Sequence, residues 1–131
     1  MQADTQPVAH RINFAGPEAY VKSFGGTGFG VVFEDDGDTG YLYATDEGQN
    51  EVFDALHLYN ASDQERLRVG EEAYIVWSHS LCKAGIYYHD RFQAIIDFRN
   101  QRSCCRTSFP PPGGTWRSSH QWEETMAADL E

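Results

Sequence analysis

Three features are scarce in this sequence of 131 residues: long apolar runs, basic residues and cysteines that could pair. No apolar run approaches the ~20 residues that cross a bilayer, so we expect no membrane-spanning helix and no membrane partner. Residues 1–14 also lack the basic and apolar regions of a signal peptide. These absences together predict a cytoplasmic protein.

The cysteines are odd in number, and two of them are adjacent: Cys82, Cys104 and Cys105. Neighbouring cysteines suit neither an ordinary disulfide nor the CxxC spacing of a zinc knuckle. Reduced thiols therefore fit best, with a redox or soft-metal pair at Cys104 and Cys105 as the alternative. We predict no metal and no cofactor.

Basic residues are half as many as acidic ones, with 10 Lys and Arg against 20 Asp and Glu, for a net charge of −10. The charge is uneven, since residues 1–60 carry −8, residues 61–117 carry +2 and residues 118–131 carry −4. An acidic surface repels phosphate backbones, which excludes nucleic acid as the expected partner. The same surface would attract a basic protein.

Apolar and aromatic residues are plentiful, at 40% and 14% of the chain, as expected of one folded domain rather than a disordered chain. Residues 1–17 show no clear period and contain the Gly16-Pro17 breaker, so we expect an irregular N-terminal segment there. A β-rich core domain is predicted for residues 18–117. It ends near a proline-rich stretch and is followed by a helical or disordered tail, residues 118–131.

The clearest pattern lies in residues 28–60, where apolar and other residues alternate on both sides of an Asp-Gly turn. Such alternation around a turn predicts a β-hairpin, and a third strand is predicted for residues 52–59. In that third strand, the alternation places His57 and Tyr59 on one face and Asp54 on the other.

Further alternating runs at residues 18–24, 73–79, 83–89 and 91–98 complete the expected strands. The last three predict an antiparallel meander. In the tail, Trp122, Met126 and Leu130 share one helical face, which predicts a short helix docked on the sheet. We therefore expect a mainly β fold (all-β or α+β), an antiparallel sheet or small sandwich of about six to seven strands with a short C-terminal helix.

Candidate binding residues gather around the first hairpin. Its turn carries Asp35, Asp36 and Asp38, and its second strand carries Tyr41 and Tyr43. Closely spaced carboxylates suit calcium or magnesium, but the spacing lacks the EF-hand pattern. A solvated acidic hairpin tip is therefore the preferred interpretation.

Candidate catalytic residues are polar side chains within or beside strands, namely His57, His89 and Asp97. Asp54 and Asp97 lie in apolar surroundings, where a carboxylate needs a partner. Residues 91–117 contain several arginines and a single acid, so Arg99 and its neighbours are the expected partners. The arrangement predicts either an anionic-ligand or acid–base site, or an internal network of salt bridges.

Several stretches resemble a family of small bacterial proteins known only as a domain of unknown function. The resemblance rests on residues 33–46 (FEDDGDTGYLYATD), 52–60 (VFDALHLYN), 74–98 and 106–112 (RTSFPPP), about two-thirds of the chain. It implies a bacterial cytoplasmic source and a compact domain. No activity is assigned to that family, so the resemblance implies no catalytic residue.

These features favour a non-enzymatic protein-binding module, immunity- or inhibitor-like, whose acidic and aromatic sheet face docks a basic protein. No complete catalytic motif is present. The alternative is a small hydrolase or anionic-ligand-binding protein that uses a strand Asp or His with an arginine. Whether the protein is an enzyme stays open at this point.

Overall fold

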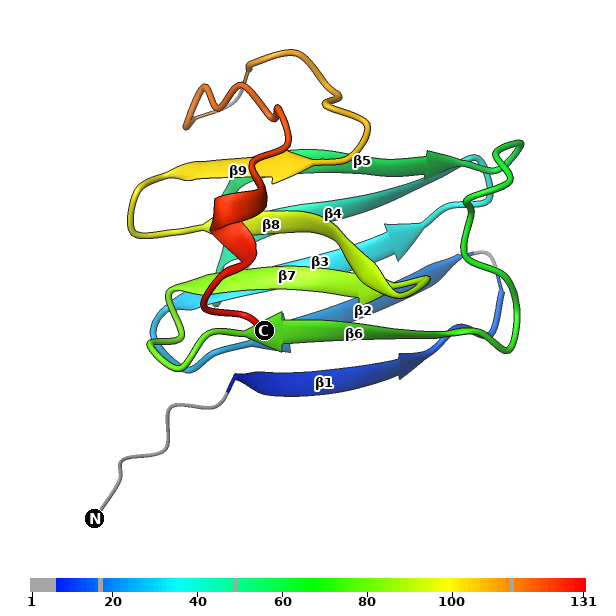
Figure 1. Ribbon diagram of the computed structural model, residues 1–131, viewed down its shortest axis with the longest axis horizontal. Helices are drawn as coiled ribbons and strands as arrows, with labels where there is room; N and C mark the ends of the chain where they lie inside the picture. Colours follow the sequence, from blue (N-terminus) through cyan, green and yellow to red (C-terminus); the bar gives the residue numbers. More distant parts are fainter. Residues whose placement is uncertain (1–6, 17, 49, 114) are drawn as a thin grey trace.

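The structure is a computed structural model that describes residues 7–16, 18–48, 50–113 and 115–131. In these residues the chain forms nine strands and one 3-10 helix. The strands make two antiparallel sheets that pack face to face (Figure 1). The mainly β prediction is confirmed, in its sandwich form.

The sheet in the foreground of Figure 1 has five strands in the order β1-β6-β7-β8-β9. Successive strands from β6 onward are neighbours, so the predicted meander is confirmed and extends by one strand. The bounds are β1 (Val8–Asn13), β6 (Glu72–Trp77), β7 (Lys83–Tyr88), β8 (Arg91–Asp97) and β9 (Arg102–Cys105).

The sheet behind it has four strands in the order β2-β3-β4-β5, each antiparallel to the next. Because all four are consecutive in the chain, this sheet is a second meander. The bounds are β2 (Ala19–Phe24), β3 (Phe29–Asp35), β4 (Thr39–Asp46) and β5 (Val52–Asn60).

The main core fills the space between the two sheets. The largest buried side chains there include Trp77 from the five-stranded sheet and Phe33 and Tyr59 from the four-stranded one. The indole N–H of Trp77 is satisfied by the Ser23 hydroxyl at 2.9 Å, which ties β6 to β2 across the core. This buried N–H group is thus paired, as a dry core requires.

A second, smaller core lies on the outer side of the five-stranded sheet. There the C-terminal segment, residues 118–131, crosses the sheet (Figure 1) and buries Met126 and Leu130 against Ile95 and Cys104. The predicted docking of Met126 and Leu130 is confirmed. The helix itself is the 3-10 turn η1 (Glu124–Ala127), shorter than a helix through Trp122 and Leu130 would be.

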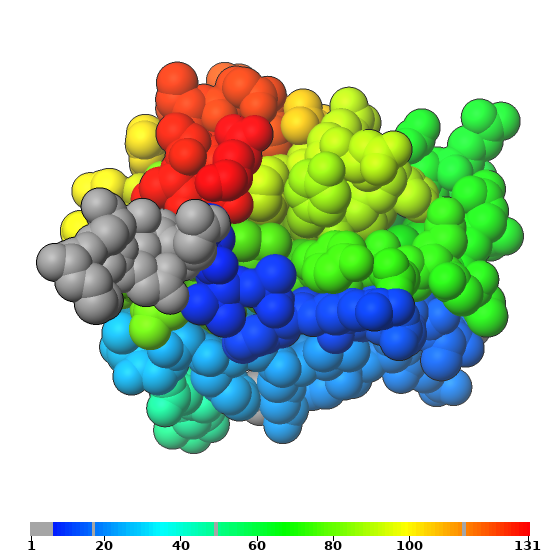
Figure 2. Space-filling model, turned by 60° about the horizontal axis from the view of Figure 1, so that its bottom comes forward, coloured from blue at the N-terminus to red at the C-terminus, as the bar shows by residue number. Residues whose placement is uncertain are grey.

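Two strands were not predicted. The expected irregular N-terminal segment contains β1, which pairs with β6 over its whole length. Figure 2 shows this dark-blue strand across the face that comes forward, beside the lighter blue of β2. Residues 1–6 and 17 of that expected segment lie outside the described residues, and β9 is a four-residue strand on β8.

The free side of β5 is partly covered by the chain that follows β9. The backbone N–H of His57 donates to the Phe109 carbonyl at 2.9 Å, and the Thr107 hydroxyl donates to the His57 carbonyl at 2.9 Å. In the part of the chain that the structure describes, no helix is long and apolar enough to cross a membrane.

Candidate functional site

The outer side of the four-stranded sheet carries a group of large apolar side chains exposed to solvent. Tyr20 is 55% exposed, Phe24 39% and Val52 52%. We call the surface formed by the outward side chains of this sheet the aromatic face, and its aromatic and aliphatic members are Tyr20, Phe24, Val32, Tyr41, Tyr43 and Val52. An exposed group of this kind marks a candidate interaction site.

The strand register explains why these side chains gather. Successive side chains in a strand point to opposite sides of the sheet, so residues paired across strands share a side. Tyr20 pairs with Glu34, and Glu34 with Tyr41. The next row on the same side joins Lys22, Val32 and Tyr43, and the third joins Phe24, Gly30 and Thr45.

A hollow of about 240 Å³ lies in the middle of the aromatic face. Its lining residues are Tyr20, Val32, Glu34, Tyr43, Thr45 and Val52. The Tyr43 hydroxyl donates to Glu34 Oε1 at 3.2 Å. Burial, together with the nearby Glu34 carboxylate, raises the pKa of Tyr43 to about 12, so this hydroxyl keeps its proton at neutral pH.

The predicted binding residues lie at several places in the fold. Tyr41 and Tyr43 are on the aromatic face, where their rings stack at 5.8 Å. Asp36 and Asp38 lie at the β3–β4 turn, at one end of that face. The Asp36 carboxylate accepts the backbone N–H groups of Thr39 and Asp38, and these bonds lower the pKa of Asp36.

Asp35 differs from its neighbours because its side chain points into the sandwich. It is 7% exposed and accepts the Tyr59 hydroxyl at 2.6 Å and the Gly37 backbone N–H at 2.9 Å. Asp35 therefore fixes the hairpin to the core. Among the described residues, no three His, Cys, Asp or Glu side chains are grouped as a metal site requires.

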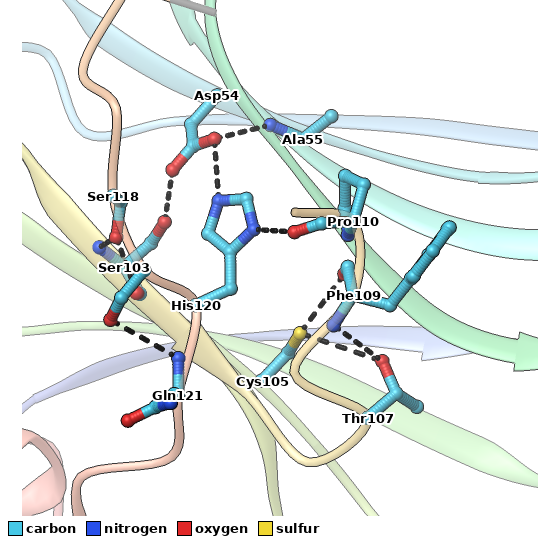
Figure 3. A network of polar contacts seen from close by, with 11 residues as sticks. Asp54, Ala55, Ser103, Cys105, Thr107, Phe109, Pro110, Ser118, His120 and Gln121 are labelled. Atoms are coloured by element: carbon cyan, nitrogen blue, oxygen red, sulfur yellow. Dashed lines mark hydrogen bonds and ion pairs between the residues drawn. The ribbon is translucent and has the colours of Figure 1, made fainter. Parts of the chain in front are cut away.

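Asp54 belongs to a buried polar network between β5, β9 and the C-terminal segment (Figure 3). Its Oδ1 lies 2.8 Å from His120 Nε2, and its Oδ2 accepts the Ser103 hydroxyl. The other ring nitrogen of His120 lies 2.6 Å from the Pro110 carbonyl oxygen. Asp54 is 5% exposed and His120 1%.

Both nitrogens of His120 face acceptors, so the geometry favours the doubly protonated imidazolium. Burial alone lowers the pKa of His120, but the hydrogen bonds to Asp54 and Pro110 outweigh it and raise the pKa above its ordinary value. The prediction that an arginine partners Asp54 is wrong, because a histidine from the tail takes that place.

The network contains Asp, His and Ser side chains but does not have the geometry of a nucleophilic triad. In such a triad the hydroxyl bonds to the imidazole, whereas Ser103 bonds to the carboxylate of Asp54. Ser103 is also only 3% exposed, and its backbone is bonded to the Ser118 hydroxyl. The arrangement can hold the C-terminal segment in place, and it offers no activated nucleophile.

The three predicted catalytic residues lie at separate places in the fold. His57 is 8% exposed, with its ring against Tyr41 and Phe109. His89 is at the β7–β8 turn, 3.1 Å from Glu71, and Asp97 is at the opposite end of β8. The structure therefore does not bring them together.

Asp97 and Arg99 do share a small cavity of about 120 Å³, as the sequence hypothesis requires. The Asp97 carboxylate, however, accepts two hydrogen bonds from Asn100, at 3.1 and 2.8 Å, and Arg99 reaches the Cys82 sulfur at 3.6 Å. The expected pairing of Asp97 with an arginine is absent from the contacts of the described residues. Asn100, three residues further along the chain, binds the Asp97 carboxylate instead.

The adjacent cysteines are buried free thiols. Cys104 and Cys105 are both 0% exposed, and burial raises the pKa of Cys104 to about 11. Protonated thiols without solvent access are poor nucleophiles and poor metal ligands. They serve as small apolar side chains of the two cores.

Sequence reasoning missed most of the residues that line the hollow, including Tyr20, Glu34 and Thr45, and it also missed Ser103 and His120. Tyr20 follows the alternation of its strand, which places it on the same side of the sheet as Tyr41, with Glu34 between them. Ser103 and His120 carry no pattern that links them to Asp54, because the contact joins positions 49 and 66 residues apart.

The chain was compared with known proteins. It is 34% identical over 86 residues to an uncharacterized protein of Haemophilus influenzae, an alignment that covers 64% of this chain and 53% of the relative. The chain thus spans about half the length of that relative. No solved structure matches it. A family model described as "Uncharacterized protein conserved in bacteria (DUF2251)" matches residues 14–131, and the chain belongs to this bacterial family.

Proposed function

We propose that this protein is a non-enzymatic binding module that docks a basic protein on its aromatic face, in the manner of an immunity or inhibitor protein. The observation that carries the proposal is the exposure of Tyr20, Phe24 and Val52 on one side of a sheet whose other side forms the core. Tyrosine is enriched among the residues that dominate binding energy at protein interfaces.

Charge supports a basic partner rather than an acidic or neutral one. Acidic residues flank the aromatic face at both ends, with Asp36 and Asp38 at the β3–β4 turn and Glu47 and Glu51 between β4 and β5. Within the face, Glu34 is acidic and Lys22 basic. Complementary charge of this kind speeds association and selects the partner's sign.

The alternative, a hydrolase or anionic-ligand-binding protein, receives less support. It needs an accessible His or Asp beside an arginine in one cavity. In the described parts of the chain, His57 and Asp54 are buried in other contacts, and the Asp97 oxygens are bonded to Asn100. We further propose a cytoplasmic location, which free thiols support.

Site-directed photo-crosslinking tests the docking proposal. A benzoylphenylalanine would replace Tyr20 on the aromatic face or, as a matched control, Val69, which is 69% exposed in the β5–β6 loop. Each protein would be irradiated in lysate of the encoding bacterium at low and at high salt. We expect a crosslink to a basic protein from position 20 that high salt removes, and none from position 69.

Two results would contradict the proposal. One is an absence of crosslinks from position 20 at low salt. The other is the same set of crosslinked proteins from both positions, since non-specific contact with an acidic surface does not depend on the aromatic face. Mass spectrometry of the crosslinked peptides identifies the partner and its charge.

A further inference from the structure

We infer that the hollow in the aromatic face is a pocket for a single arginine side chain of the docked partner. This inference rests on the proposed function, and it adds the chemistry that the partner must present. The hollow holds two aromatic walls, one carboxylate and one buried hydroxyl, and each of these is a known contact of a guanidinium group.

The aromatic walls are Tyr20 and Tyr43. An aromatic ring attracts a cation held over its face, and arginine also stacks on such a ring through its planar guanidinium. The protein's own Lys22 already lies over the Tyr20 ring, with Nζ 5.7 Å from the ring centroid. This part of the surface therefore attracts a cation.

The carboxylate is Glu34, whose known contact is the Tyr43 hydroxyl on Oε1. Among the ion pairs formed by the described residues, none includes Glu34. Its Oε2 is therefore available to an incoming donor. A guanidinium provides such donors in a planar fork that fits a carboxylate.

Thr45 gives independent support. The residue is 3% exposed and lines the hollow, and its Oγ1 has no hydrogen-bond partner in the described structure. A buried hydroxyl without a partner is unfavourable in a folded protein, so it needs an explanation. This oxygen is closed to water in the free protein, so a donor in the hollow would reach it only after a neighbouring side chain moves aside.

The size of the hollow limits what it can hold. At about 240 Å³ it is smaller than the pockets of roughly 300–1,000 Å³ that hold drug-sized ligands. One long side chain suits it better than a nucleotide or a cofactor. Arginine suits it better than lysine, because its planar fork can offer two N–H groups to the Glu34 carboxylate while the plane stacks on a tyrosine.

N-acetyl-arginine amide is the probe for this inference, because it carries the guanidinium without charged termini. It would be titrated into the full chain while ¹H–¹⁵N NMR spectra are recorded, with N-acetyl-citrulline amide as the uncharged control. We expect saturable shifts confined to residues around the hollow, such as Val32, Glu34 and Thr45, and none with citrulline.

Four variants test which side chains contribute to binding of the arginine probe. Glu34→Gln should weaken binding about tenfold and Thr45→Val, which keeps the side-chain shape, about threefold. Lys22→Met should strengthen binding about threefold, because it removes a neighbouring positive charge. Glu65→Gln, at an exposed position in the β5–β6 loop, is the matched control and should leave the affinity unchanged.

The inference is overturned if citrulline amide shifts the same signals, or if Glu34→Gln and Thr45→Val bind the arginine probe as the unchanged protein does. These outcomes are separate from those of the crosslinking test. Crosslinks from position 20 without arginine binding would contradict the arginine pocket but still support docking on the aromatic face. Arginine binding without crosslinks would contradict the docking proposal but still support a guanidinium-binding pocket.

Discussion

The imidazole of His120 joins the C-terminal segment to β5 through a buried charge pair. Removing one member of such a pair leaves the other charge buried without its partner, which costs more than the pair itself contributes. Asp54 would then keep only the Ser103 hydroxyl and the Ala55 backbone N–H, at 3.0 Å, as partners. The stability of the protein should therefore depend on His120 more than on any exposed histidine.

We predict that His120→Gln lowers the free energy of unfolding by about 3 kcal/mol at pH 6. Urea denaturation followed by tryptophan fluorescence measures the change. His79→Gln is the matched control, because His79 is exposed and makes none of the side-chain hydrogen bonds found in the described structure. Equal stability of the two variants would show that the charge pair does not hold the segment.

The loss of stability caused by His120→Gln should also depend on pH. The folded-state pKa of His120 is raised above its ordinary value of 6.5. Its stabilising contribution is thus complete below about pH 6.5 and declines as the pH rises through the folded-state pKa. The stability difference between the unchanged protein and His120→Gln should be smaller at pH 9 than at pH 6, and a pH-independent difference would argue for packing alone.

At the scale of the element, the C-terminal segment acts as a cover for the outer side of the five-stranded sheet. Met126 is 2% exposed and packs with Ile95 and Cys104, while the guanidinium of Arg106 lies 3.6 Å from the Trp122 ring. A four-residue 3-10 turn has little stability of its own, so these contacts must hold it. Loss of one large buried side chain should loosen the whole cover.

We predict that Met126→Ala costs about 2–5 kcal/mol and exposes Cys104 to alkylation. Iodoacetamide labelling of the native protein, read by mass spectrometry at each cysteine, measures the exposure. Val69→Ala is the control, since Val69 is 69% exposed and its removal should leave both stability and labelling unchanged. If Cys104 stays protected in Met126→Ala, the segment does not act as its cover.

Element by element, the sequence predicted the strands with strong alternation and missed those without it. In β1 only Ile12 is buried, and β9 has four residues, so neither carries a readable period. Both owe their order to a neighbouring strand, which is tertiary information. The site followed this division only in part: Tyr41 and Tyr43 were found on a predicted strand and His120 lies outside one, but Tyr20 and Thr45 lie on predicted strands and were missed.

The predicted faces of β5 show a second limit. Alternation placed His57 and Tyr59 on one side, but a register shift lies between them: Tyr41 pairs with His57, and Gly40 with Tyr59. His57 therefore contacts Tyr41, whereas Tyr59 enters the core and bonds Asp35. A bulge adds one residue and reverses the side of everything beyond it, and alternation alone does not reveal it.

At the scale of the whole molecule, the net charge of −10 influences how fast a basic partner associates, and the aromatic face determines where it binds. These two contributions can be separated by two double variants that change the net charge by the same amount at different places on the surface. Asp38 and Glu47 are exposed acids at opposite ends of the aromatic face, whereas Glu65 is in the β5–β6 loop and Glu131 is the last residue of the C-terminal segment.

We predict that Asp38→Lys/Glu47→Lys weakens binding of the crosslinked partner about tenfold at low salt, while Glu65→Lys/Glu131→Lys weakens it less than threefold. Both double variants carry the same net charge of −6, since each reversal adds two units to −10. Surface plasmon resonance at two salt concentrations measures the association rates. Equal losses in the two variants would mean that total charge governs binding. If only Asp38→Lys/Glu47→Lys loses affinity, the interaction is located at the aromatic face. High salt should then reduce this loss, because salt screens charges more than ~10 Å apart.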